Sequence, residues 1–214
     1  MTLTINEFMP ISQKSEIDLS KKFTVFVGKN NSGKTYVSQL IWAINSFSTF
    51  ENRYYSYENN QKIDFINKLD KSEIQIEITK IDFGKILQNF TNYIVDKRLK
   101  EVFKSDVKAD IDIKFDYEYF KKKEISKNLK FKIAQIQFCI EKKKESDILT
   151  IFIDATNILE ENLQNFSFST LNKIIEGKII ELLIDKNSIY MPSTRLFLPS
   201  FYKYIYTIEK EFKD

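Results

Sequence analysis

The residues best suited to chemistry form one continuous stretch, Gly28-Lys29-Asn30-Asn31-Ser32-Gly33-Lys34-Thr35. The stretch fits the phosphate-binding pattern G-x-x-x-x-G-K-[ST] at every fixed position. The chain has only four glycines in 214 residues, so two of them in this register are informative. The alternative is an ordinary glycine turn before a helix, but such a turn needs neither Lys34 nor Thr35. We therefore interpret residues 28–35 as a phosphate-binding loop.

The backbone and two side chains of this loop indicate what the chemistry would be. Gly28 and Gly33 permit conformations that a Cβ would hinder, so successive amide N–H groups can turn around phosphate oxygens. The amides that begin the following helix add donors and a favourable dipole. Lys34 is expected to reach the β and γ phosphates, and the Thr35 hydroxyl is expected to ligate Mg²⁺. The loop thus predicts binding of a nucleoside triphosphate.

The residues on either side have the patterns that would position the loop. Phe23–Val27 is a short β-rich run that ends at the first glycine of the loop. Tyr36–Ile44 continues without Gly or Pro, which predicts a helix. Strand, loop and helix in this order are what a phosphate-binding loop requires.

The variable positions of the loop indicate a class of protein. The sequence G-K-N-N-S-G-K-T resembles the G-x-N-N-S-G-K-[ST] loop of the ABC-type ATPases. It is most similar to that of the RecF, SMC and OLD (overcoming lysogenization defect) families and their AAA-labelled bacterial relatives. Leu3–Phe8 and Ser15–Leu19 resemble the opening pair of strands in these proteins. The resemblance covers roughly the first 45 residues and implies ATP and Mg²⁺ as ligands.

The resemblance and the apolar pattern together predict an α/β fold. We expect an incomplete P-loop NTPase core of the ABC type, with an antiparallel β-subdomain and a helical insertion. We expect a single ATPase segment, 1–214, with four stretches. Residues 1–45 hold the strands, the P-loop and the first helix, and residues 46–108 an insertion with a helix. Residues 109–154 form an antiparallel meander, and residues 155–214 hold a helix, a core strand and the start of the next helix.

Periodicity predicts the elements inside these stretches. Residues 46–80 read as irregular, and Phe83–Phe103 and Leu171–Ile184 as helices. Apolar and charged residues alternate from Ala109 to Tyr119, which predicts a half-buried strand whose three aspartates line a solvated face rather than a metal site. A phase change at Ile133-Ala134 predicts a β-bulge. Later patterns predict a strand at Ile148–Ile153, a returning core strand at Ser188–Pro192 and a helix that begins at Phe201.

Two residues outside the loop are candidate site residues. Asp154 follows the apolar run Leu149–Ile153 and could hold Mg²⁺ through water. Arg195 follows Pro192, and this segment resembles one after a core strand in AAA-labelled OLD relatives. An arginine there would contact phosphate or act as a switch, and a plain surface arginine is the equal alternative. No glutamate follows Asp154, and the sequence contains no L-S-G-G-Q-like signature.

The absence of this glutamate and of the signature motif from the sequence determines which function we expect. We expect an ATP-binding N-terminal half of an ABC-type ATPase, either a fragment or a split gene product, with the catalytic residues unknown. The resemblance implies that a missing C-terminal half or a second protomer completes an ATP-sandwich dimer. It also implies a role in DNA maintenance or anti-phage defence, with DNA or an effector nuclease as partner. Two alternatives remain, a self-sufficient small P-loop kinase and a non-catalytic module that binds nucleotide as a structural ligand.

Composition excludes several other functions. The chain has no histidine, so histidine acid/base chemistry and histidine metal sites are excluded. Its single cysteine, Cys139, lies in an apolar run and is interpreted as a buried core thiol. No secretory signal or membrane span is recognisable, which favours a cytoplasmic protein. A net charge of +3 is too small to indicate nucleic-acid binding, and Lys121–Lys123 and Lys142–Lys144 are interpreted as solvated turns.

Tyr54, Tyr55 and Tyr57 lie in the polar insertion. They could stack on a nucleobase, but we favour an insertion loop with partly packed aromatic side chains.

Overall fold

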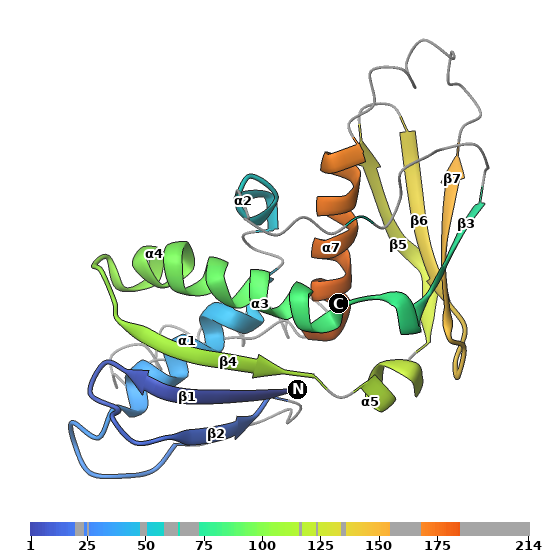
Figure 1. Cartoon of the computed structure of the whole chain (residues 1–214). Helices are drawn as coiled ribbons and strands as arrows, with labels where there is room; N and C mark the ends of the chain where they lie inside the picture. The colour runs from blue at the N-terminus through green and yellow to red at the C-terminus, as the bar shows by residue number, and fades with distance from the viewer. Residues whose placement is uncertain are drawn as a thin grey trace, which may run out of the picture.

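The computed structural model describes residues 1–19, 24, 26–47, 51–57, 64, 73–115, 117–122, 124–133, 136–154 and 168–184 (Figure 1). It is a mixed α/β structure with two small antiparallel sheets. The elements are β1 (Thr2–Phe8), β2 (Ser15–Asp18), α1 (Lys34–Asn45), α2 (Glu51–Tyr55), β3 (Glu73–Glu77), the 3₁₀ turn η2 (Ile78–Lys80), α3 (Phe83–Tyr93), the π-helical η3 (Ile94–Arg98), α4 (Leu99–Phe103), β4 (Ala109–Lys114), α5 (Tyr117–Lys122), β5 (Ile125–Ile133), β6 (Ile136–Lys142), β7 (Ile148–Asp154) and α7 (Phe168–Ile184).

The first sheet has the order β2-β1-β4. The predicted opening pair of strands is confirmed, with β1 antiparallel to β2. On its other side β1 pairs with β4, which places Leu3 opposite Ile113 and Ile5 opposite Ile111. Leu3 and Ile5 are fully buried. Burial of such side chains contributes roughly 1.5–3 kcal/mol each, so this central strand anchors the N-terminal part of the fold.

The second sheet has the order β3-β7-β6-β5, all antiparallel. The meander predicted for 109–154 is confirmed for β5, β6 and β7 and is wrong for β4, which belongs to the first sheet. The bulge predicted at Ile133-Ala134 is also wrong. Ile133 pairs with Ile136, so the change of phase marks a reversal of the chain between two strands. Sequence phase alone does not distinguish these two causes, because both invert the alternation.

Further differences concern local elements. The strand predicted over Ala109–Tyr119 ends at Lys114, and Tyr117 begins α5. Residues 46–80 were predicted to be irregular, but they contain α2 and β3. The alternation Glu73-Ile74-Gln75-Ile76-Glu77 was the sequence signal for β3, whose partner β7 lies more than seventy residues later in the chain.

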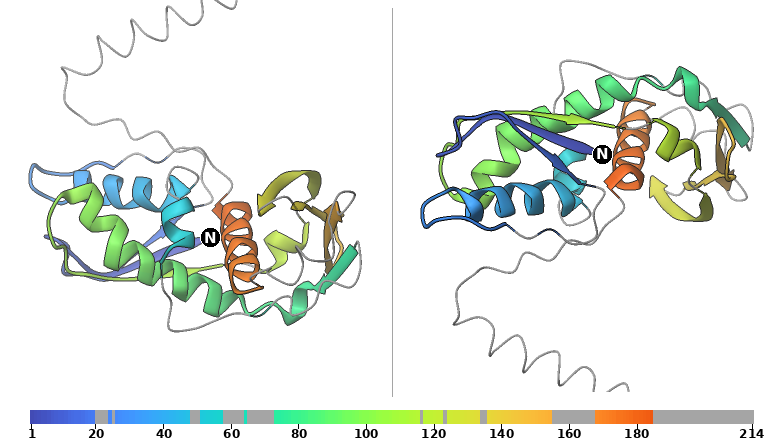
Figure 2. Two further views of the ribbon diagram at one scale, coloured as in Figure 1. Left: turned by 90° about the horizontal axis from the view of Figure 1, so that it is seen from above. Right: turned by 90° about the horizontal axis from the view of Figure 1, so that it is seen from below.

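Helices lie along the first sheet and between the two sheets (Figure 1). The predicted helix at Phe83–Phe103 is confirmed as α3, η3 and α4 in succession. Asp82 caps its start by accepting a hydrogen bond from the amide of Lys85 (2.9 Å). The predicted helix at Leu171–Ile184 is confirmed within α7, which stands between the two sheets in Figures 1 and 2. No helix in the described ranges is both long and apolar enough to cross a lipid bilayer.

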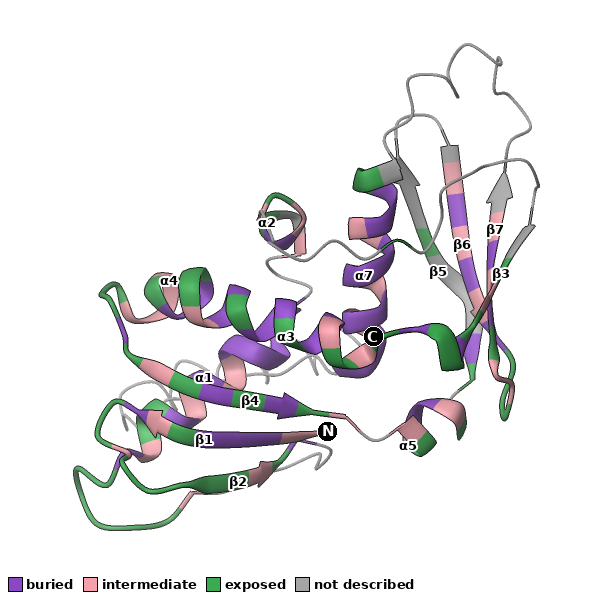
Figure 3. Cartoon of the chain, viewed as in Figure 1, coloured by how far each residue is buried: buried purple, intermediate pink, exposed green. Residues whose placement is uncertain are grey.

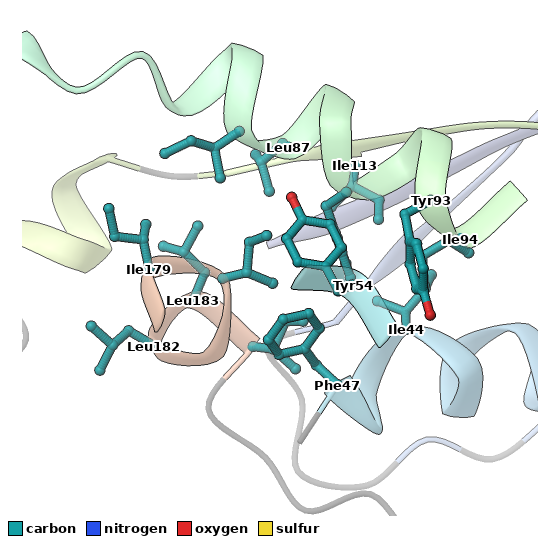
Figure 4. Packing of buried hydrophobic residues seen from close by; sticks show 14 of the residues in the cluster. Ile44, Phe47, Tyr54, Leu87, Tyr93, Ile94, Ile113, Ile179, Leu182 and Leu183 are labelled. Atoms are coloured by element: carbon teal, nitrogen blue, oxygen red, sulfur yellow. The ribbon is translucent and has the colours of Figure 1, made fainter. Parts of the chain in front are cut away.

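The core between α1, α3 and α7 is rich in aromatic side chains. Tyr54 of α2 is fully buried and meets Phe47, Phe90 and Tyr93 in edge-to-face contacts, with ring centroids 5.3–6.2 Å apart. Figure 4 shows Tyr54 together with Phe47 and Tyr93. Such pairs contribute roughly 0.5–1.5 kcal/mol beyond their buried area. The expected packing of aromatic side chains is therefore confirmed, although Tyr54 and Tyr55 lie on a helix rather than in a loop.

A buried polar cluster joins α2, α3 and α7. The Glu176 carboxylate, 3% exposed, accepts hydrogen bonds from the Tyr54 hydroxyl (2.5 Å) and the Asn89 side-chain amide (3.1 Å). Lys173 completes it, with its Nζ 3.4 Å from Glu176 Oε2 and 4.1 Å from the Tyr54 ring centre. Burial lowers the pKa of Lys173, while the neighbouring carboxylate opposes that shift. We name these four residues the Glu176 cluster.

The prediction that the two lysine clusters are solvated turns is only partly correct. Lys142 is 1% exposed, and its ammonium donates to the carbonyl oxygens of Lys121 (2.6 Å) and Lys143 (3.1 Å). Burial lowers the pKa of Lys142. Lys143 and Lys144 do lie exposed after β6, whereas Lys121 and Lys122 end α5.

Five other predictions remain. Cys139 is half-buried in β6 rather than fully buried. Asp110 and Asp112 are exposed, as expected for a solvated strand face, and Asp116 lies outside the described residues. The predictions at Ser188–Pro192, Arg195 and Phe201–Phe212 also lie outside them.

Gly177 is placed where α7 meets α2. A Cβ built on Gly177 would lie 2.3 Å from Cε1 of Tyr55, closer than side chains tolerate. In an open helix Gly→Ala stabilises by about 1 kcal/mol. We expect Gly177→Ala to lower the free energy of unfolding by about 1–3 kcal/mol instead, because the methyl group overpacks the helix contact. Urea denaturation followed by circular dichroism measures this.

Gly84 of α3 is the matched control, since a Cβ there would meet only Asp82 Oδ1, at 3.4 Å. Gly84→Ala should be neutral or stabilising. Tyr55→Ala should remove most of the penalty of Gly177→Ala in a double variant, because the clash requires both side chains. Equal effects of the two alanines would contradict this packing.

Candidate functional site

The predicted phosphate-binding loop, residues 28–35, leads into α1 at one end of the molecule. Figure 2 shows the segment before α1 at the outer edge, and Figure 3 shows most of it exposed. Helix α1 confirms the predicted helix at Tyr36–Ile44. It is held by the buried side chains of Val37, Leu40 and Ile44, so the loop is carried on a helix fixed in the core.

The strand expected before the loop is not established. Thr24, Phe26 and Val27 are described without regular secondary structure, and Phe23 and Val25 lie outside the described residues.

Gly33 is required at its position for two reasons. Its φ of 84° lies in the left-handed region, which side chains rarely adopt. A Cβ there would also lie 3.0 Å from Cγ1 of Ile11 and 3.4 Å from Cγ of Pro10. Pro10 and Ile11 connect β1 to β2, so the loop packs directly against that connection. Sequence reasoning missed this contact because it joins residues more than twenty positions apart.

Gly28, at the other end of the loop, also has little space beside it for a side chain. A Cβ on Gly28 would lie 3.0 Å from Oγ of Ser32, closer than most real contacts. The Ser32 amide donates to the carbonyl of Lys29 (3.3 Å), closing a turn across the variable positions. Asn31 takes a left-handed φ of 63°, which asparagine tolerates better than most residues. The loop thus curls back on itself between its two glycines.

The Lys34 side chain lies inside this curl. Its ammonium donates to the carbonyl oxygens of Gly28 (2.8 Å) and Lys29 (2.5 Å), and it lies 3.3 Å from Ser32 Oγ. A residue of the helix therefore holds the far end of the loop through three acceptors. This placement puts a positive charge at the centre of the loop, where an anion would be held.

The N-terminus of α1 adds to the same positive potential. The first amides of any helix lack intrahelical partners, and here the cap is Gly33, which offers no side-chain acceptor. The first turn carries no acidic residue. Nothing on the helix itself therefore compensates its dipole, which favours a negatively charged ligand at this end.

The remaining predicted loop residues are available to a ligand. Lys29, Asn30 and Asn31 are exposed, and so is Thr35 in the first turn of α1. An exposed hydroxyl on the residue that follows Lys34 is the kind of oxygen ligand that Mg²⁺ takes. In the described part of the chain, no group of three or more Cys, Asp or Glu side chains is placed to hold a metal ion.

The structure does not bring Asp154 to the loop. Asp154 is the last residue of β7, in the second sheet. The end of β7 and the start of α1 lie at opposite ends of the molecule in Figures 1 and 2. The hypothesis that Asp154 shares a metal with Thr35 therefore gains no support from this arrangement. Arg195 lies outside the described residues.

Comparisons of the chain with protein-family models, with curated proteins and with solved structures found no match.

Proposed function

We propose that this chain binds ATP with Mg²⁺ through residues 28–35. The observation that carries the proposal is the position of Lys34, whose ammonium is enclosed by the carbonyls of Gly28 and Lys29 at the N-terminus of α1. A glycine turn that only connected two elements would need no lysine ammonium bonded to its carbonyl oxygens. A lysine ammonium that faces the backbone of the loop, next to a helix N-terminus without a capping side chain, is placed to bind a triphosphate.

Each loop residue then has a distinct role in binding. The amides of the loop and of the first turn of α1 would donate to phosphate oxygens. Lys34 would exchange a carbonyl partner for an oxygen of the β or γ phosphate. The Thr35 hydroxyl would be one ligand of Mg²⁺, whose charge neutralises the phosphates when it is bound. The two glycines keep the backbone close enough for these contacts.

We further propose that this segment belongs to an ABC-type ATPase resembling the RecF, SMC and OLD families. The loop sequence G-K-N-N-S-G-K-T and the confirmed antiparallel pair β1–β2 support this assignment. Because the sequence has no signature loop and no Asp-Glu strand, a second half or a second protomer would complete the site. DNA maintenance or anti-phage defence, with DNA or an effector nuclease as partner, is the role that the resemblance implies.

The proposal is tested by thermal unfolding with nucleotide. Mg·ATP at about 100 times its Kd should stabilise the fold by ~2.7 kcal/mol, because it binds the folded state only. Thr35→Ala should reduce the enhancement of ATP binding by Mg²⁺ more than it reduces binding without the metal. Thr79→Ala, an exposed threonine of η2, is the control and should change neither value.

Other nucleotides and turnover separate the alternatives. GTP should compete with ATP within a few-fold, since the sequence has no guanine-reading motif, and a strong preference for GTP would contradict the ABC-type assignment. The chain alone should hydrolyse ATP hardly above background. Several turnovers per second would favour the self-sufficient kinase or another complete enzyme.

A further inference from the structure

Three exposed apolar residues lie close in sequence to the loop or to the residues packed against it. Among the described residues, the large apolar side chains that remain exposed are Met9, Val27, Tyr36 and Ile148. Met9 precedes Pro10, which borders Gly33, and Val27 precedes Gly28, while Tyr36 lies in the first turn of α1. Only Ile148, at the start of β7, is elsewhere. Single exposed apolar residues need no explanation, but Tyr36 is aromatic and directly follows the loop in the chain.

Tyr36 is the aromatic residue of these three, and its ring packs against Phe103. The ring is tilted by 33° against Phe103 of α4, with centroids 5.9 Å apart. Phe103 in turn meets the fully buried Phe8 edge to face, at 5.8 Å. Tyr36 nevertheless remains 38% exposed. An aromatic face fixed from behind is suited to stacking.

We propose that Tyr36 stacks on the base of the bound nucleoside triphosphate. The inference rests on the proposed function, because it needs the phosphates to occupy residues 28–35. Tyr36 directly follows Thr35 in the first turn of α1, so its ring is the aromatic side chain next to the proposed phosphate-binding residues in the chain. Tyr54, considered as a base-stacking residue from the sequence, is fully buried and cannot take that role.

The stacking role also determines base selectivity. Every nucleobase has a π face, so stacking is tolerant of base identity. Tyr36 should therefore raise the affinity for purine nucleotides in general, without the hydrogen-bonding pattern that distinguishes adenine from guanine.

The experiment compares two ligands that differ in the nucleoside, Mg·ATP and Mg·tripolyphosphate, by isothermal titration calorimetry. Tyr36→Leu keeps an apolar side chain and removes the ring, and it should weaken ATP binding about tenfold. It should leave tripolyphosphate binding unchanged. Tyr36→Phe should bind ATP within about threefold of the unchanged chain, since it retains the π face. Ile148→Leu, at a comparably exposed apolar position of the other sheet, should alter neither ligand.

The outcomes separate the two proposals. Equal weakening of ATP and tripolyphosphate by Tyr36→Leu would show that Tyr36 shapes the loop and would overturn stacking, as would unchanged ATP binding. Failure of the unchanged chain to bind either ligand would overturn the proposed function itself. Tyr36→Trp gives a second readout that keeps a ring. ATP, but not tripolyphosphate, should quench the added indole beyond any change at Trp42, and equal quenching by both ligands would contradict stacking.

Discussion

Lys34→Ala should abolish measurable ATP binding while the chain remains folded. The substitution removes the ammonium that lies 2.8 Å and 2.5 Å from the carbonyl oxygens of Gly28 and Lys29, where the phosphates are proposed to bind. Hydrogen bonds to charged groups contribute about 1.5–3 kcal/mol each, so the loss should reach ~100-fold or more in Kd. Calorimetric titration with Mg·ATP measures it.

Folding should survive because the loop contributes little to the core. Helix α1 is anchored by Val37, Leu40 and Ile44, none of which contacts solvent appreciably. Circular dichroism and the midpoint of thermal unfolding without nucleotide should therefore change by only a few degrees.

Lys29→Ala is the control for overall charge. It also removes one positive charge from the same loop, but the Lys29 side chain is exposed and only its backbone carbonyl contacts Lys34. ATP affinity should fall by no more than a few-fold. If Lys29→Ala and Lys34→Ala weaken binding equally, a diffuse positive potential rather than a built phosphate site holds the ligand.

Glu176→Ala should be the most destabilising single change among the polar residues of the Glu176 cluster. It leaves the Tyr54 hydroxyl and the Asn89 amide without their carboxylate acceptor, and it removes the counter-charge of Lys173. Breaking a buried pair by removing one partner costs about 3–5 kcal/mol, because the remaining charge stays desolvated. For a chain of this size, the midpoint of thermal unfolding should fall by roughly 10 °C.

A second Lys–Glu pair on α7 provides the matched control. Lys178 and Glu181 have the same three-residue spacing as Lys173 and Glu176, with Nζ 2.8 Å from Oε2, but the Glu181 side chain is 33% exposed. Lys178 also keeps a second partner in Glu51, at 3.1 Å. Glu181→Ala should cost less than about 1 kcal/mol. A comparable loss from both variants would indicate that the Glu176 cluster is not the specific link between α2, α3 and α7.

Predictions from the sequence succeeded where the cause was local. Helical periodicity identified Phe83–Phe103 and Leu171–Ile184, because a single face of a helix must be apolar to reach a core. Alternation identified β5, β6 and β7 as neighbours, because strands joined by short connections pair with each other. The proposed phosphate-binding role of residues 28–35 also rests on local sequence, since the glycines, the lysine and the threonine of the motif are adjacent in the chain, and it stays a proposal.

Predictions failed, or had no basis, where the cause was a distant partner. The alternation of Ala109–Lys114 indicated a strand but not that its partner is β1, a hundred residues earlier. Lys142 resembled a solvated lysine, yet α5 supplies a carbonyl oxygen that allows it to be buried. Periodicity describes which faces of an element are apolar, and it does not state what covers them.

The amino-acid sequence by itself determined the identity of the loop residues, the run of helices and the presence of a strand-rich second half. Tertiary structure alone decided that Pro10 and Ile11 crowd the space beside Gly33, that Glu176 bonds Tyr54, Asn89 and Lys173, and that Tyr36 packs against Phe103. Each of these contacts joins elements far apart in the chain. Their energies depend on close approach and on exclusion of water, which arise only when the separate elements pack together.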